Sequence, residues 1–267
     1  MAERQLDLFS DTGVQTSHAP PQGAPRALTA ADMDDEALMA AIPGSGLAES
    51  AELAAEAGRR RLAAAVPALV ALGRRFAGFG LDRMVPEQAA ALQALAVIGG
   101  RDAAHAVAEM IERAVVRGPT LSVALTAAAR LRATLSADVL RWLLRHSEPG
   151  IRADACRCAR PLPELIAVLV DLLDDLDRAV AKAAACALGH MGRVEARPAL
   201  KSLLRSEPSE EVIDAITSIA DEECVVLLGR IARAMPDLAE AALDSLDNID
   251  QPRAGAVAAA IQRLPRA

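Results

Sequence analysis

The hydrophobic and polar positions of this chain repeat as pairs of amphipathic segments, with a period of about 30 residues. Within each segment apolar residues recur at helical spacing, and Gly, Pro, Ser or Asp residues separate one segment from the next. The pattern is clearest where residues 178 to 189 precede residues 195 to 206. A helical hairpin that cannot bury its apolar face alone must stack on its neighbours, so this period predicts a solenoid with a long open surface.

The Gly, Pro, Ser and Asp residues that separate the segments predict about seven helical hairpins from Leu47 onward. The first helices are expected near residues 47 to 58, 87 to 98, 120 to 132, 150 to 159, 178 to 189, 209 to 220 and 237 to 248. Their partners are expected near residues 62 to 77, 102 to 117, 136 to 146, 162 to 174, 195 to 206, 222 to 234 and 252 to 264. Leu188 aligns with Leu95, Ala128, Cys156, Ile216 and Leu246 at spacings of 28 to 33 residues, which indicates a regular array.

The segment before the hairpins has a different character. Residues 1 to 30 are polar and contain Pro20, Pro21 and Pro25, which predicts a disordered tail. Residues 31 to 46 predict a short acidic helix, capped by Thr29, and a linker. We therefore expect one repeat domain over residues 47 to 267.

Composition supports an all-α fold. The chain has three Phe, one Trp and no Tyr, and its apolar residues are mostly Ala, Leu and Val. Small side chains allow helices to pack closely, whereas a β-sandwich or barrel of this size would draw on aromatic and β-branched residues.

The distribution of charged residues limits the kinds of partner and the cellular location that we expect. The net charge is −7, and residues 1 to 36 hold seven acids against two arginines, so the remainder is nearly neutral. We therefore expect no direct contact with nucleic acid. The densest basic cluster consists of Arg59 to Arg61 with Arg74 and Arg75. It is either a local surface that contacts phosphate or a set of solvated helix ends. The acidic N-terminus and the interrupted apolar stretches predict a cytoplasmic protein that does not cross a membrane.

The metal-ligating residue types are scattered. Cys156 and Cys158 lie about 200° apart around one helix, so both cannot easily face one ion. Cys186 and Cys224 also fall in apolar helical stretches. We expect four reduced, buried thiols, no metal site and no cofactor.

The stretch from Asp177 to Leu204, with Arg178-Ala179-Val180, Ala184-Ala185-Cys186-Ala187-Leu188-Gly189 and Ala199-Leu200, resembles a HEAT repeat of the type found in phycobilisome-lyase-like proteins. The resemblance extends over residues 47 to 264. It implies a right-handed α-α superhelix, and a role in binding proteins as a scaffold or adaptor. Because the alanines and leucines specify helix packing, the motif is specific for fold and weak for function.

The resemblance also implies that the second helices line the concave face and contact a partner there. Helical position places Glu109, Glu112 and Asp171 on or near this face. The candidate partner-binding residues are Arg113, Arg141, Trp142, Arg145, Lys201 and Arg205. For Trp142 we expect packing in the core, and an exposed Trp142 would instead be a binding hot spot.

Gln5-Leu6-Asp7-Leu8-Phe9 resembles the peptide by which bacterial polymerases and repair proteins dock on the replicative sliding clamp. The resemblance implies that Gln5 forms hydrogen bonds, that Leu6 and Leu8 make hydrophobic contacts, and that Phe9 is the terminal anchor. Asp7 occupies the tolerant central position. The alternative is a short amphipathic tail that docks on the first repeat.

Enzymatic function has little support in the sequence. Glycine-rich phosphate loops and Gly-x-Ser-x-Gly elbows are missing from it. We therefore predict a protein that is not an enzyme and has no catalytic residues. The alternative is a HEAT-like enzyme, similar to a DNA-repair glycosylase or a bilin lyase, that uses the groove.

Overall fold

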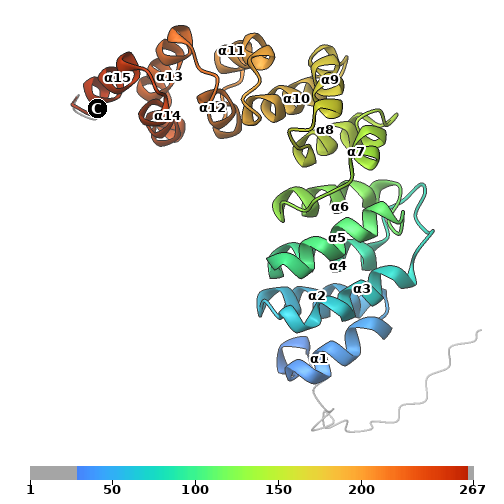
Figure 1. Cartoon of the computed structure of the whole chain (residues 1–267). Coiled ribbons are helices and arrows are strands. Elements are labelled where there is room, and N and C mark those ends of the chain that lie inside the picture. Colours follow the sequence, from blue (N-terminus) through green and yellow to red (C-terminus); the bar gives the residue numbers. More distant parts are fainter. Residues whose placement is uncertain (1–28, 264–267) are drawn as a thin grey trace, which may run out of the picture.

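The computed structural model describes residues 29–263, and this part of the chain contains α- and 3-10 helices and no strand. Seven helical hairpins stack one on another, as the sequence predicted, and the stack bends between its two halves (Figure 1). The first helices are α2 (Leu47–Arg59), α4 (Pro86–Ile98), α6 (Pro119–Arg130), α8 (Pro149–Cys158), α10 (Arg178–His190), α12 (Glu210–Thr217) and α14 (Pro236–Asn248). The second helices are α3 (Val66–Arg75), α5 (Gly100–Glu112), α7 (Ala137–Leu143), α9 (Pro163–Asp171), α11 (Arg197–Ser206), α13 (Glu222–Ala234) and α15 (Pro252–Gln262).

A short helical segment precedes the hairpins. It consists of η1 (Ala30–Asp32), α1 (Asp35–Ala41) and η2 (Ile42–Gly44). Leu38 and Ile42 are fully buried and belong to the same continuous core as the repeats. This segment therefore covers the apolar end of the first hairpin.

Helix boundaries follow from local chemistry. Pro67 and Pro198 stand at the starts of α3 and α11, where a missing N–H costs least. Further 3-10 turns flank the second helices, namely η3 (Ala63–Ala65), η4 (Leu172–Asp174) and η5 (Val194–Ala196). Helix α5 ends at Glu112, earlier than expected, because Ala114 adopts a left-handed conformation at φ 50°. Val115 then donates to the carbonyl of Met110 at 3.0 Å, which closes the turn.

Two glycines near the end of α10 have different roles. Gly192 has φ 71° in the turn, as expected for a position that favours glycine. Gly189 lies inside α10 rather than at its end. A Cβ there would collide with the carbonyl oxygen of Ala215 and approach Leu200 Cδ1 to 2.9 Å. Gly189 therefore permits the close approach of α10 and α12.

The first helices form one closely packed layer of the stack, and the second helices form the other layer. Consecutive first helices pack directly on one another from α2 to α14, whereas consecutive second helices touch more sparsely. Figure 1 shows α8, α12 and α14 on the inner side of the bend and α9, α11 and α13 on the outer side. The alanines and Gly189 permit this close packing of the first helices, because small side chains let the helix axes approach.

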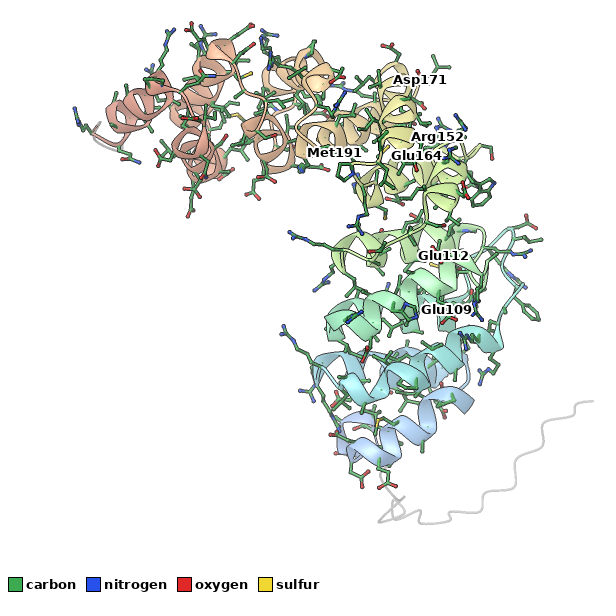
Figure 2. The ribbon with its side chains drawn as sticks, in the orientation of Figure 1. Glu109, Glu112, Arg152, Glu164, Asp171 and Met191 are labelled. Atoms are coloured by element: carbon green, nitrogen blue, oxygen red, sulfur yellow. The ribbon has the colours of Figure 1, made fainter. Side chains whose placement is uncertain are left out.

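In the C-terminal half of the stack, this arrangement differs from the expectation that the second helices line the concave face. Glu109, Glu112 and Asp171 project on the outer side of the bend (Figure 2). The candidate partner-binding residues belong to second helices or to the turns that follow them, and their role in binding stays a prediction. They are Arg113, Arg141, Trp142, Arg145, Lys201 and Arg205. The repeat pattern in the sequence identified the helices. Which layer of helices faces the concave side depends instead on how closely the helices of each layer pack.

Candidate functional site

An exposed apolar patch lies where the connection between α3 and α4 meets α7. It consists of Leu81 and Trp142, which lie close together. Phe79 and Met84, on the same connection as Leu81, are exposed as well, and between 50% and 65% of each of the four side chains is accessible. Most large apolar side chains of the described chain are buried. Trp142 was expected in the core, and this expectation is wrong. A cluster of exposed large apolar residues is typical of a surface that another molecule covers.

The connection between α3 and α4, residues 76 to 85, is the longest between helices in the described chain. The buried side chain of Gln88 holds it by donating to the carbonyls of Gly73 at 3.0 Å, Phe76 at 3.2 Å and Val115 at 3.1 Å. At the far end, the backbone N–H of Val85 donates to Thr120 Oγ1 at 2.9 Å. These bonds fix both ends of the connection on the repeat that follows.

The middle of this connection lies against the turn between α5 and α6. A Cβ at Gly118, where φ is 51°, would collide with the carbonyl oxygens of Gly80 and Leu81. Only glycine allows this approach without displacing the backbone. Leu81 is thereby brought near Trp142, which lies 61 residues later in the chain.

A hollow of about 380 Å³ opens beside the apolar patch. Leu81 and Trp142 form part of its wall, and the rest is mainly aliphatic. The other lining residues are Ile111, Ala114, Val116, Arg117, Gly118, Leu121 and His146. The rings of Trp142 and His146 meet edge to face with centroids 5.4 Å apart, which fixes the orientation of the indole. The hollow can accept a side chain or a short apolar segment.

One arginine lines the hollow, and others lie close to its lining residues in the sequence. Arg117 lines it, and Arg145 lies one helical turn beyond Trp142. Neither forms an ion pair with any residue of the described chain. Arg113 and Arg141 do pair, with Glu109 at 3.0 Å and with Asp138 at 2.6 Å. The hollow is therefore mainly apolar, with Arg117 as the one arginine in its lining.

The structure separates the predicted site residues into two groups. Arg141, Trp142 and Arg145 lie on or directly after α7, and Arg113 ends α5, next to the turn that lines the hollow. Lys201 and Arg205 lie on α11, in another part of the stack. Lys201 Nζ contacts Asp221 at 2.6 Å and Glu223 at 2.8 Å, and Arg205 pairs with Glu223. This second group ties α11 to α13.

Sequence reasoning did not identify Phe79, Leu81 and Met84 as surface residues. One signal was present: Phe76 and Phe79, two of only three Phe, stand in a stretch that breaks the helical pattern. The Gln5–Phe9 peptide lies outside the described residues.

The densest basic cluster has a structural role. Arg60 contacts Glu56 at 2.5 Å and Asp35 at 2.8 Å, and Arg75 donates to the carbonyls of Pro43 and Ser45. Arg74 pairs with Glu109 at 2.9 Å. These contacts attach the N-terminal helical segment and the neighbouring repeat to the first hairpin, so much of the cluster is occupied by the protein itself.

The four cysteines are buried and carry no disulfide. Burial raises the pKa of the Cys156, Cys158 and Cys186 thiols to about 12, and that of Cys224 to about 11. Thiols with such pKa values stay protonated near neutrality and are poor nucleophiles. Residues 29–263 contain no group of His, Cys, Asp or Glu arranged to hold a metal ion.

Comparison with known proteins places this fold among helical repeats. The family model for HEAT repeats matches residues 137–220. A solved complex of CpcE and CpcF of phycocyanin lyase, from Nostoc sp. PCC7120, contains a chain that is similar to this one with a TM-score of 0.56 and 18% identity. The similarity covers 94% of this chain and 100% of that chain. Among the curated proteins, none matches the sequence.

The similarity contradicts the prediction that the protein is not an enzyme. That prediction rested on the catalytic motifs missing from the sequence and on the open surface of a solenoid, yet a chain of similar fold occurs in a phycocyanin lyase complex. An open helical stack is therefore no argument against a part in catalysis. Within residues 29–263, no helix has the length and apolar character needed to span a bilayer. We conclude that the chain carries HEAT repeats in residues 137–220, within a helical-repeat fold similar over nearly its whole length to a chain of the CpcE–CpcF complex.

Proposed function

We propose that the protein binds another protein through the apolar patch and its hollow. The observation that carries this proposal is the exposure of Trp142 beside a preformed apolar hollow. Trp and Arg are the residues that most often dominate the affinity of protein interfaces. The connection between α3 and α4 is anchored at both ends, so ordering it on binding costs little.

The partner that fits is an apolar segment flanked by acidic residues. Its apolar side chains enter the hollow beside Leu81 and Trp142, and its carboxylates face Arg117 and Arg145. The similar chain from Nostoc was solved in a complex of CpcE with CpcF, which supports a role in assembly with a second protein.

A photo-activated cross-linking residue at position 142 tests the proposal in the native host. The matched control carries the same residue at position 194, because Val194 is 55% exposed and lies in the turn after α10. We expect one protein to cross-link at position 142 and not at position 194. Equal cross-linking at both positions, or none at position 142, would contradict the proposal.

A second candidate function is that of a subunit of a lyase-type enzyme complex, which the similarity to the phycocyanin lyase chain favours. The test is to incubate the protein and its cross-linked partner with phycocyanin and with its pigment-free form, and to follow pigment absorbance. An unchanged spectrum with the intact assembly would remove this candidate.

The sequence of Gln5-Leu6-Asp7-Leu8-Phe9 supports a separate contact with the replicative sliding clamp. Calorimetric titration of the full chain with purified clamp tests it. We expect micromolar binding that is lost in the Leu8→Ala, Phe9→Ala variant. Identical binding by the variant would exclude this contact without affecting the proposal for Trp142.

A further inference from the structure

A second hollow, of about 540 Å³, lies at the edge of the stack where the turn after α4 meets the turn after α6. Figure 1 shows that α4, α5 and α6 are neighbours in this part of the stack. Ala96, Ala104 and Ala108 leave the space open, because their side chains are too short to fill it. The polar residues that line it are Arg101, His105, Arg130, Arg132 and Thr134.

The charges of this hollow are all of one sign. Its lining contains three arginines and no carboxylate. Arg160 adds a fourth guanidinium, since its Nη1 donates to Thr134 Oγ1 at 2.6 Å. Asp102 follows Arg101 in sequence but does not line the hollow.

These arginines differ from most others in the chain. Within residues 29–263, Arg101, Arg130 and Arg132 form no ion pair, although ion pairs are frequent elsewhere along the stack. Like charges held together repel one another, and the repulsion is relieved when an anion is bound. In a repeat region that is nearly neutral overall, this cluster concentrates positive charge.

We propose that this hollow, which we call the arginine hollow, binds a small molecule with two or more phosphate or carboxylate groups. Guanidinium groups bind both kinds of anion through paired N–H donors. The size of the hollow suits a small ligand. Nucleic acid would need a basic surface that continues along the stack, whereas the three arginines that line this hollow belong to two neighbouring turns, with Arg160 on the next.

Calorimetric titration of the full chain with pyrophosphate and with citrate, against KCl of equal ionic strength, tests the proposal and separates the two kinds of anion. The variant is Arg130→Gln with Arg132→Gln, and Arg101→Gln is a second, independent variant. The matched control is Arg230→Gln with Arg233→Gln, because both side chains are exposed on α13 and form no ion pair in the described chain. Thermal unfolding confirms that each variant is folded.

We expect at least one of the two anions to bind, the Arg130, Arg132 variant to weaken binding by about tenfold or more, and the control to bind like the unchanged protein. The same affinity in all variants, or no binding beyond the effect of KCl, would overturn the proposal. So would an oligonucleotide that binds through the same arginines and is not displaced by pyrophosphate. Trp142→Ala should bind the anion normally, so this test fails or succeeds independently of the proposed protein contact.

Discussion

Arg152 and Asp175 form a two-pronged ion pair that links α8 to the connection before α10 near the bend. Arg152 Nε and Nη2 each lie 2.9 Å from an oxygen of Asp175, and Arg152 Nη1 donates to the carbonyl of His146 at 2.9 Å. Asp175 also accepts from the backbone N–H of Asp177 at 2.9 Å. Figure 2 shows Arg152 on α8, where the stack changes direction. The pair therefore ties the turn after α7 to the turn before α10.

Removal of Arg152 should destabilise the protein. Both side chains of the pair are largely buried, so Arg152→Ala leaves the Asp175 carboxylate without its partner, at a cost of about 2–4 kcal/mol. Urea unfolding measures the change. The control is Arg178→Ala, whose exposed pair with Glu207 at 3.2 Å should contribute less than about 1 kcal/mol. Equal losses in the two variants would show that the pair does not hold the turns together.

The layer of first helices should resist a single added methyl group at Gly189. Its new Cβ would collide with the carbonyl of Ala215, so Gly189→Ala should force α10 and α12 apart and cost about 1–3 kcal/mol. In the same layer, a Cβ at Gly58 would find its nearest neighbour, Ala94 Cα, at 3.4 Å. Gly58→Ala should therefore be neutral, or stabilising by up to about 1 kcal/mol through helix propensity. Thermal unfolding of both variants measures these changes. A Gly189→Ala protein as stable as the unchanged protein would contradict the packing described for this layer.

Acid should weaken the contribution of Glu56. Hydrogen bonds from Arg59 and then Arg60 lower the pKa of this carboxyl from 4.5 to about 2. Because the folded-state pKa is depressed, the stabilisation is complete above pH 4.5 or so and is lost as the pH falls toward 2. The stability difference between the unchanged protein and Glu56→Gln should thus shrink between pH 5 and pH 2, and urea unfolding across this range measures it. A difference independent of pH would show that the ion pairs of Glu56 do not stabilise the fold.

The thiols should be inert while the protein is folded. Their raised pKa values leave almost no thiolate at pH 8, and burial keeps reagents away. Mass spectrometry after brief iodoacetamide treatment should find all four unmodified, and full labelling only after denaturation. Rapid labelling of any cysteine in the native protein would show that its helix opens.

The sequence predicted the helices well because each boundary depends on nearby residues. The helix expected at residues 178 to 189 is α10 (Arg178–His190), and Asp177 caps it as the pattern implied. The helix expected over residues 222 to 234 is α13 with the same bounds. Hydrophobic periodicity and capping residues carry this information locally.

The surfaces could not be predicted in the same way because they join distant residues. Periodicity shows that Trp142 lies on a helix, but its exposure depends on how α7 packs between its neighbours. The hollow beside it also needs Leu81, which the long connection brings across. The arginine hollow had a weak signal, since Arg101 and Arg130 lie about one repeat apart and near hairpin turns. Only the stacked turns show that these arginines share one space.

The affinity of the protein for the partner captured at position 142 tests the central claim most directly. Calorimetry with the purified partner should show that Trp142→Ala weakens binding by about tenfold or more, the loss expected of a hot spot. Val194→Ala, which removes an exposed apolar side chain far from the patch in sequence, should bind like the unchanged protein. A Trp142→Ala variant that is folded and binds with unchanged affinity would contradict the claim that the apolar patch is the binding surface.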